Sequence, residues 1–577
     1  MFSRRRVLFR LPHSLLALAL LVLTACNLYA GEWTKELAPG VVLTQIVKEC
    51  SGPNDNTIPR IINIVKVDPK APGIKIKMVL GGDCVWGLDK TKGRETIGSM
   101  AKRLRAIAVL NTDFCNWTGD PLGLHISGGE LVSEPYPNRT MFGITSDGQY
   151  LFDRLEFDAR IILPDGRWFP IRGINRPRGD HEMVVYTPKF FKSTCTESNG
   201  SEAVVISPDL PIRLGVPLKG TVTCVNPDAG DTPIPENGIV LSGRGTGSDF
   251  IKENLKEGVE LTLQFNVKGE TTTGWEKVIE ATGGTPRLVR NGKISLEVEK
   301  ENLTLDSKFV TVTHPRSALG VTADGKLVLV TVDGRQEVST GMPLKDLAEL
   351  MLSIGCVDAM NLDGGGSTTL STWFGTLNSP SDGWLRPLPN ALAVFAEEAE
   401  DFDVPEFTIS APSAPIVAGS TVRLSLVDSS GQPIDPKLAE KAIWSMNGVT
   451  NFVDQGGVLH AGRVGETEIV VKLDGKIASL PIEVISKATG KLTAELIPDP
   501  SGDANKSILN VLVVDAAGKP VQDCMVSVKV TGGASDQPWK NTNADGKASF
   551  AITWEEGTSG EVTASVEGLT PFTIKRQ

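Results

Sequence analysis

Residues 360–370 read Met-Asn-Leu-Asp-Gly-Gly-Gly-Ser-Thr-Thr-Leu and place a carboxylate, an amide, three hydroxyls and three consecutive glycines directly after an apolar segment. Three glycines lose a large amount of backbone entropy when they become ordered. An ordered run therefore indicates that the backbone approaches a ligand closely or turns through positive φ. Their N–H groups could also form a concave anion site. The alternative is a tight turn, in which Asn361 and Asp363 are ordinary turn formers.

The sequence before this loop predicts a strand, a helix and a second strand. Residues 326–332 read as a buried strand, and Pro343 and Gly355 bracket an apolar-periodic stretch typical of a helix. Residues 356–360 are apolar and short enough for another strand. The glycine loop then lies at a strand's carboxyl end, where sheets with crossover connections bind ligands. The loop lacks the spacing of nucleotide-phosphate and dinucleotide motifs.

Several segments together resemble the phosphodiester glycosidase family. The main signature is carried, in order and spacing, by residues 315–320, 332–335, the predicted helix and residues 361–367. Weaker matches are residues 111–114, 123–124, 128–132, 139–144, 281–289 and 386–394. The resemblance covers residues 33–396. Thr112 and Cys115 depart from the family pattern and bear on substrate fit. His125 could face either way in its strand.

The resemblance implies a hydrolase that cleaves the glycosidic bond of a sugar, such as N-acetylglucosamine, attached through a phosphodiester. Such a reaction needs carboxylates near the sugar and cations or N–H donors near the phosphate. Asp363 is the first candidate for the catalytic carboxylate, with Asp333 or Asp113 as its partner. Because phosphate is an acidic leaving group, one carboxylate could suffice. Inversion or retention follows from a carboxylate separation of roughly 6.5–9.5 Å or 5–5.5 Å.

The substrate-binding candidates combine cations, amides, hydroxyls and glycines. Arg316 is the first candidate for a phosphate clamp and Arg386 the second, although Arg316 could instead form a structural ion pair. The full set is Arg316, Asn111, Asn361, Gly364, Gly365, Gly366, Ser367, Thr368 and Arg386. No cofactor is required by the sequence. Calcium or magnesium could bind if Asp113, Asp333 and Asp363 converge in an oxygen shell.

Length and charge set broad limits on the class of protein. The chain has 577 residues, which indicates three to four units. Its net charge of -11 and the lack of a basic stripe argue against nucleic-acid binding. We predict an α+β catalytic domain on a mixed β-sheet, followed by two all-β immunoglobulin-like sandwiches. The predicted boundaries are 1–30 signal segment, 33–397 catalytic domain, 398–406 acidic linker, 407–487 first sandwich and 490–577 second sandwich.

The first thirty residues predict export. Arg4, Arg5 and Arg6 precede an apolar core at residues 15–23, and residues 23–26 resemble a bacterial lipoprotein box. Cys26 would then carry a lipid that anchors the protein to a membrane. Cleavage after Ala30 would instead release a secreted protein. The expected location is the periplasm or cell surface, and the expected partner is a sugar-phosphate or polysaccharide substrate.

The C-terminal part alternates apolar and polar residues between glycine-containing turns, a pattern typical of β-sandwiches. Residues 511–521 and 542–550 resemble bacterial immunoglobulin-like repeats of invasin type. A spacer or adhesion role is expected, and a non-catalytic surface glycan-binding protein is the alternative for the whole chain. Cysteine proximity suggests disulfides between Cys50 and Cys84 and between Cys195 and Cys224.

Overall fold

The computed structural model describes residues 31–51, 57–115, 118–336, 338–397, 404–412, 416–449, 451–485, 490–515, 518–522, 524–566 and 569–576. Strands make up 49% of the structure and helices 9%. The prediction of an α+β catalytic domain is therefore wrong, because this part of the chain is mostly β. The prediction generalised from one well-marked helix, whereas the rest of the domain consists of short strands joined by turns.

An eight-stranded sheet carries the glycine loop. Its order is β1 (Gly31–Ala38), β2 (Val41–Ser51), β3 (Thr57–Val67), β22 (Leu327–Val332), β21 (Arg316–Thr322), β23 (Cys356–Asn361), β19 (Arg287–Arg290) and β20 (Lys293–Ile294). Strands β22 and β23 each pair antiparallel with β21 and are joined through α5 (Leu344–Ser353). The predicted strand, helix and strand are thus confirmed locally. The glycine loop follows β23 directly.

A nine-stranded sheet packs against the eight-stranded one. Its order is β29 (Ile416–Val417), β36 (Lys476–Ile485), β35 (Gly465–Leu473), β32 (Ile443–Gly448), β25 (Gly375–Thr376), β24 (Leu370–Thr372), β6 (Ala108–Asn111), β27 (Asn390–Phe395) and β4 (Lys75–Leu80). Leu110 and Leu392 of this sheet share a buried core with Leu43 and Leu319 of the other. Helix α5 covers the opposite face of the eight-stranded sheet through residues such as Leu347.

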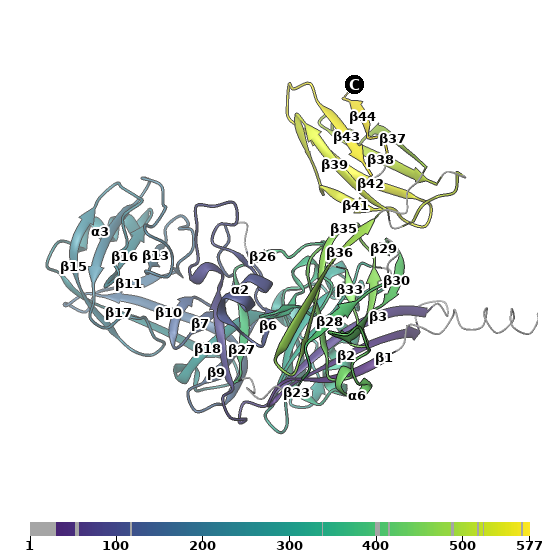
Figure 1. Ribbon diagram of the computed structural model, residues 1–577. Coiled ribbons are helices and arrows are strands. Elements are labelled where there is room, and N and C mark those ends of the chain that lie inside the picture. The colour runs from purple at the N-terminus through teal and green to yellow at the C-terminus, as the bar shows by residue number, and fades with distance from the viewer. Residues whose placement is uncertain are drawn as a thin grey trace, which may run out of the picture.

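A twelve-stranded sheet forms a lobe at the far side of the molecule (Figure 1). Its strands are β12 (Gly173–Ile174), β13 (Met183–Tyr186), β16 (Gly238–Gly243), β14 (Ser201–Ile206), β15 (Leu218–Asn226), β17 (Glu260–Gly269), β10 (Tyr150–Ile162), β9 (Thr140–Thr145), β18 (Val278–Gly284), β7 (His125–Ser127), β8 (Glu130–Ser133) and, beside β10, β11 (Trp168–Ile171). Helix α3 (Thr246–Asn254) packs on β14 and β16. Strands β7, β9 and β18 connect the lobe to the site described below.

Short helices and a short ribbon complete residues 33–397, the predicted catalytic part of the chain. They are α2 (Ile97–Leu104), α4 (Lys308–Thr311), and the pair β5 (Glu95–Thr96) and β26 (Pro387–Leu388). Among the pairings of the described strands, only β12–β13 and β29–β36 are parallel. The mixed sheet that was expected is therefore almost entirely antiparallel.

The first C-terminal unit is joined to the catalytic part by strand pairing. Thr376 of β25 pairs with Met446 of β32, so one sheet runs through both. The backbone N–H of Gln455 donates to Oε1 of Gln45 at 2.8 Å, which adds a buried hydrogen bond between them. The remaining elements of this unit are β28 (Phe407–Ser410), β30 (Ser420–Arg423), β31 (Ser425–Asp428), α6 (Pro436–Ala439), β33 (Phe452–Val453) and β34 (Val458–Ala461).

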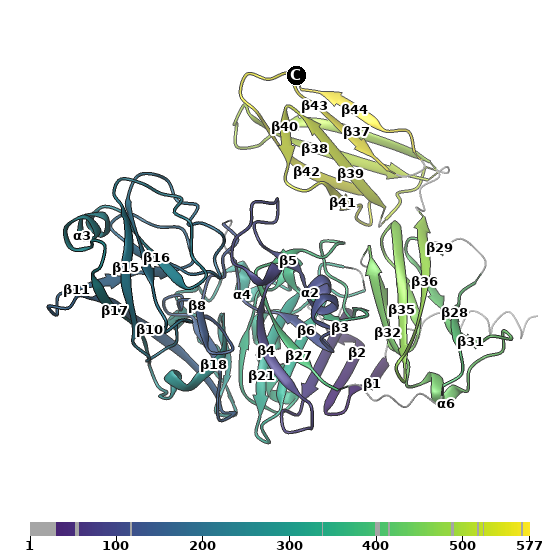
Figure 2. The same ribbon diagram turned by 60° about the vertical axis from the view of Figure 1, so that its left-hand side comes forward.

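The second C-terminal unit has two four-stranded sheets around its own core (Figure 2). One sheet contains β37 (Lys491–Pro498), β38 (Lys506–Val514), β42 (Lys547–Trp554) and β40 (Gly533–Ser535). The other contains β41 (Trp539–Asn541), β39 (Met525–Thr531), β43 (Glu561–Ser565) and β44 (Phe572–Lys575). This is the layered arrangement of a β-sandwich.

The cysteine pairings suggested by the sequence are wrong where the structure describes them. Cys84, Cys195 and Cys224 are free thiols, and Cys195 and Cys224 are both exposed. Proximity in sequence is a weak guide because a disulfide also needs the two Cβ atoms to face each other. Cys26, the predicted lipid site, and the side chain of Cys50 lie outside the described residues. Among the helices described, none is long and apolar enough to cross a bilayer.

Candidate active site

A cleft of about 1380 Å³ opens beside the glycine loop. From the catalytic part it is lined by Arg94, Phe114, Cys115, Arg335, Asp363, Ser367, Asp382, Trp384 and Arg386. Residues of both C-terminal units complete its wall, among them Arg463 and Trp539. The combination of carboxylates, cations and aromatic rings is typical of a site for a charged, sugar-containing ligand.

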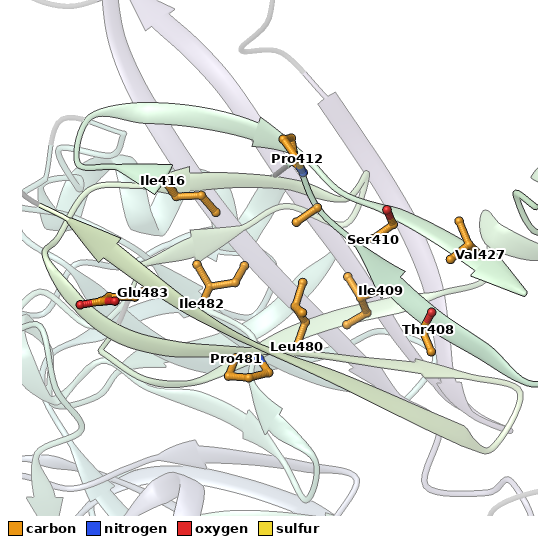
Figure 3. A pocket seen from close by; sticks show the side chains of 11 residues that line it. Thr408, Ile409, Ser410, Pro412, Ile416, Val427, Leu480, Pro481, Ile482 and Glu483 are labelled. Carbon is orange, nitrogen blue, oxygen red and sulfur yellow. The ribbon is translucent and has the colours of Figure 1, made fainter. Parts of the chain in front are cut away.

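A second hollow of about 610 Å³ lies between β28 and β36 of the first C-terminal unit. Figure 3 shows that aliphatic side chains such as Ile409, Leu480 and Ile482 line it. Glu483 is its one charged lining residue. This hollow offers no group of residues for catalysis, so the cleft beside Asp363 is the candidate active site.

Asp363 is held in the cleft by the loop that the glycines form. Its backbone N–H donates to the carbonyl of Thr112 at 2.9 Å. Its side chain accepts hydrogen bonds from Ser367 and from the N–H of Gly364. Burial nevertheless raises the pKa of Asp363 to about 6, against the effect of these hydrogen bonds and of Arg386 and Arg139. The structure therefore places a partly desolvated carboxylate at the cleft surface.

Asp113 lies beneath Asp363 and is buried. Its Oδ1 accepts from the N–H of Phe114 and its Oδ2 from the N–H of Gly123, both at 2.7 Å. Burial, with a smaller contribution from the charge of Asp363, raises the pKa of Asp113 to about 6 against the opposing effect of Arg139. The two carboxyl groups are therefore electrostatically coupled. The structure thus brings together two of the three predicted catalytic aspartates.

Asp333 lies away from the cleft lining. Its Oδ1 accepts from Nδ2 of Asn378 at 2.8 Å and its Oδ2 from the N–H of Ser379 at 2.9 Å. Burial raises the pKa of Asp333 to about 7. Arg463 holds the same loop by donating to the carbonyls of Pro380 and Ser381. Asp333 therefore positions the loop that carries Asp382 into the cleft, and its catalytic role stays a prediction.

Arg386 lies in the cleft beside the glycine loop. Its Nη1 donates to Oγ of Ser367 at 3.2 Å, and its Nη2 donates to Asp382 at 2.6 Å. Arg335 faces the same region, and burial lowers its pKa while the nearby Asp382 opposes this. These guanidinium groups make the cleft suitable for an anion next to the Asp363 carboxylate.

Arg139 is a candidate that the sequence analysis missed. One of its side-chain nitrogens, Nη1, is buried without a hydrogen-bond partner among the described residues. Its charge acts on both Asp113 and Asp363. Its Cζ lies 5.0 Å from the ring of Phe114, which lines the cleft. A buried N–H without an acceptor is unfavourable, so an anionic ligand would complete this site. The sequence did give a signal for Arg139, because this residue begins the family-like stretch 139–144.

Arg316 is placed differently from the prediction. The side chain is buried, its Nε donates to the carbonyl of Met342 at 2.9 Å, and its Nη2 donates to the carbonyls of Phe309 and Val312. Burial lowers the pKa of Arg316 to about 10. These contacts use the guanidinium to hold backbone. They favour a structural role, and the role of phosphate clamp stays a prediction.

The contacts of Arg316 predict an effect on stability. Replacing Arg316 by methionine removes its three hydrogen bonds to the carbonyls of Met342, Phe309 and Val312 and should lower the free energy of unfolding by roughly 3 kcal/mol. Replacing the half-exposed Arg386 by methionine should instead raise KM and change stability little. Urea unfolding and steady-state kinetics of both variants check this contrast. A loss of phosphodiester affinity in Arg316→Met at unchanged stability would contradict it.

The two predicted asparagines hold the glycine loop from inside. Nδ2 of Asn111 donates to the carbonyl of Asp363 at 2.7 Å, and its Oδ1 accepts from Ser317 and Thr369. Nδ2 of Asn361 donates to the carbonyls of Thr285 and Leu362. Both side chains are buried. They therefore position Asp363, and direct contact with a sugar stays a prediction.

The glycines of the loop meet steric demands. Gly365 has φ +63°, a Cβ on Gly366 would lie 2.2 Å from Oδ1 of Asp382, and a Cβ on Gly364 would lie 2.7 Å from the carbonyl oxygen of Pro315. The expected positive φ is thus confirmed at Gly365, whereas Gly364 and Gly366 are required by close contacts within the protein. Ser367 lines the cleft, whereas Thr368 is buried with its Oγ1 unpartnered among the described residues.

His125 is buried behind Asp113. Its Nδ1 lies 3.2 Å from Nδ2 of Asn390, whose Oδ1 accepts from Thr112 and from the N–H of Asp113. Burial lowers the pKa of His125 to about 3, so the ring is neutral. It therefore supports the Asp113 loop through Asn390.

Asp113, Asp333 and Asp363 do not form a common oxygen shell. Asp333 binds the Asn378–Ser379 turn instead, and no group of three or more His, Cys, Asp or Glu side chains suited to a metal occurs among the described residues. Among the described residues, the three aspartates therefore do not converge as the calcium or magnesium site considered from the sequence would require.

Part of the chain is similar to known proteins. Residues 216–395 match the family model for phosphodiester glycosidases. Over 156 residues the chain is 40% identical to N-acetylglucosamine-1-phosphodiester alpha-N-acetylglucosaminidase of Bos taurus, covering 25% of this chain and 29% of the relative. This region is therefore homologous to those enzymes, and the homology supports a hydrolase of glycosidase type. Asp363 and Arg386 lie inside the matched residues, whereas Asp113 and Arg139 precede them.

Two further similarities concern a bacterial relative and the fold. Over 177 residues the chain is 42% identical to the SPbeta prophage-derived uncharacterized protein YomE of Bacillus subtilis (strain 168), covering 27% of each chain. The matched part thus spans less than a third of either of these relatives. A crystal structure from Burkholderia pseudomallei K96243 superposes with a TM-score of 0.54 at 17% identity, covering 64% of this chain and 97% of that chain. At that identity the likeness concerns the fold alone.

Proposed function

We propose that this protein is a hydrolase that cleaves the glycosidic bond of a sugar attached through a phosphodiester. The observation that carries the proposal is the position of Asp363, a carboxylate with a raised pKa in a cleft lined by Arg335 and Arg386. N-acetylglucosamine is the proposed sugar because the bovine relative is named for it. Homology over residues 216–395 supports the reaction class.

The geometry suits a reaction in which the phosphate is the leaving group. Water adds to the anomeric carbon, the bond from that carbon to the phosphate oxygen breaks, and the electron pair leaves with the phosphate. The products are a free sugar and a phosphate monoester. Asp363 acts on the anomeric carbon directly as nucleophile or accepts the proton of the attacking water. Arg386 and Arg139 would stabilise the negative charge that grows on the phosphate.

Export and the natural substrate are also part of the proposal. The basic and apolar first thirty residues, with Cys26 as lipid site or Ala30 as cleavage site, support a location outside the cytoplasmic membrane. A polysaccharide or other glycan joined through phosphodiesters would be the substrate there. The two C-terminal units are proposed to be immunoglobulin-like, in keeping with their short alternating strands.

Product analysis tests the proposed function. The purified chain without residues 1–30 is incubated with UDP-N-acetylglucosamine, with and without a chelator, and free sugar is measured against sugar phosphate. Free N-acetylglucosamine is the expected product. Sugar phosphate would show cleavage of the other phosphate bond and would contradict the proposal. Absence of turnover on this and on a panel of glycan phosphodiesters would favour a glycan-binding surface protein.

The coupled carboxyl groups predict the pH dependence of the reaction. Asp363 works in its ionised form, so kcat/KM should fall as the pH drops through about 6, where Asp363 and Asp113 both titrate. Because repulsion between two carboxylates is mutual, Asp113→Asn should move this acid limb to lower pH. Profiles of kcat/KM from pH 4 to 8 check both expectations. An identical limb in Asp113→Asn would contradict the coupling.

A further inference from the structure

The second C-terminal unit forms part of the cleft wall. Trp539 of β41 packs on the loop at residues 380–386, which carries Asp382 and is called the catalytic loop below. A Cβ on Gly383 of this loop would lie 2.5 Å from the Trp539 ring. Cζ of Arg463, from the first C-terminal unit, lies 5.8 Å from the same ring. Trp539 therefore sits where the catalytic part and both C-terminal units meet. A spacer would not need to reach the candidate active site.

Two tryptophans line this cleft, each from a different part of the chain. Trp384, from the catalytic loop, is 48% exposed, and Trp539, from the second C-terminal unit, is half-buried. An exposed indole ring leaves a large apolar surface in water, which often marks a binding site. Its flat apolar face and single N–H donor suit stacking against a sugar ring. The pair thus provides two stacking surfaces in one cleft.

Unpartnered polar atoms lie near these rings. Oγ of Ser381 and Oδ1 of Asn541 are buried without a hydrogen-bond partner among the described residues, and both residues line the cleft. Buried polar atoms are normally paired, so these two are available to the hydroxyls of a ligand. They belong to different parts of the chain, as the two tryptophans do.

The size of the cleft points to a long ligand. Its volume of about 1380 Å³ exceeds the roughly 300–1,000 Å³ typical of small-molecule pockets. One sugar and one phosphate would fill only the part next to Asp363. The remaining space extends between the catalytic loop and the second C-terminal unit.

We propose that Trp539 and Asn541, together with Trp384, form a distal subsite that binds further sugar units of an extended carbohydrate substrate. This inference rests on the proposed function, because it places the reacting phosphodiester at Asp363. It assigns the second C-terminal unit a role in substrate selection. The subsite would discriminate between substrates by their length and not by the identity of the reacting sugar.

Kinetics on two substrate lengths test the subsite. The probes are a dimer and a hexamer of N-acetylglucosamine joined by 1→6 phosphodiester bonds. The full-length chain should prefer the hexamer in kcat/KM. Trp539→Ala should lower the hexamer value by roughly five- to tenfold and leave the dimer value unchanged. Asn541→Ala, which removes no packed ring, should lower it in the same direction. Trp168→Ala removes a 53% exposed tryptophan of the far lobe and serves as control.

A binding measurement separates the two proposals. Calorimetry of the Asp363→Asn chain with the same hexamer requires no turnover. Hexamer affinity that falls in Trp539→Ala supports the subsite even if the native chain cleaves neither probe, which would overturn only the proposed function. Equal effects of Trp539→Ala on dimer and hexamer, no effect on either, or no binding of the hexamer would overturn the subsite.

Discussion

Replacement of Asp363 by asparagine should reduce kcat by roughly 10³–10⁴-fold, the range for a group that takes part in proton transfer or bond formation. Asparagine has nearly the same size, so the hydrogen bonds of the glycine loop should persist. Substrate affinity should therefore remain close to that of the native chain. Single-turnover kinetics measure the chemical step, and calorimetry with UDP-N-acetylglucosamine measures binding.

A matched control distinguishes catalysis from general damage to a buried carboxylate. Asp153 is also buried and accepts from the N–H groups of Thr271 and Thr272 at 2.7 Å, but it lies in the far lobe. Asp153→Asn should lower stability and leave kcat unchanged. A kcat of Asp363→Asn within tenfold of the native value would remove this residue from the chemistry. The pair of variants therefore tests the role of position, since each replaces one aspartate by an asparagine of nearly the same size.

The local structure around the glycine loop was predictable because its signals are local. A proline and a glycine bracket α5, the flanking apolar runs form β22 and β23, and Gly365 has the expected positive φ. The class of the domain was not predictable from this segment. One helix between two strands suggested an α+β domain, whereas long-range antiparallel pairing of short strands determines the observed fold.

The choice between arginines also depends on tertiary contacts. Arg316 and Arg139 both lie in family-like stretches, and sequence reasoning selected Arg316. In the structure the carbonyls of Met342, Phe309 and Val312 occupy the Arg316 guanidinium, while Nη1 of Arg139 has no partner among the described residues. Nothing in the sequence around either arginine specifies which carbonyls will surround it.

The extent of the cleft could not be read from the sequence because it is assembled from distant segments. Phe114, Asp363 and Trp539 lie far apart in the sequence, yet all line it. The contact of Trp539 with Gly383 depends on how the second C-terminal unit docks, and short alternating strands carry no signal for docking. From the sequence these strands suggested a spacer. The contacts of Trp539 in the structure favour a role of the second C-terminal unit in the cleft instead.

Removal of the Arg139 charge should have the second largest effect. Arg139→Met keeps an unbranched apolar chain beside Phe114 but deletes the cation that faces Asp113 and Asp363. If Arg139 stabilises the departing phosphate, kcat/KM on UDP-N-acetylglucosamine should fall roughly a hundredfold, as when one preorganised donor is lost. Arg160→Met is a matched control, because the Cζ of Arg160 also lies over an aromatic ring, that of Trp168, but outside the cleft.

A substrate without phosphate identifies what Arg139 contacts. With 4-nitrophenyl α-N-acetylglucosaminide the leaving group is a phenolate, so no phosphate charge develops and Arg139→Met should lose little activity relative to the native chain. Its selectivity for the phosphodiester over the nitrophenyl glycoside should therefore collapse. An equal loss on both substrates would show instead that Arg139 positions the sugar or the two carboxylates. Because Arg139 also lowers the pKa of Asp113 and Asp363, the comparison is made above pH 8, where both carboxyl groups remain ionised in the variant.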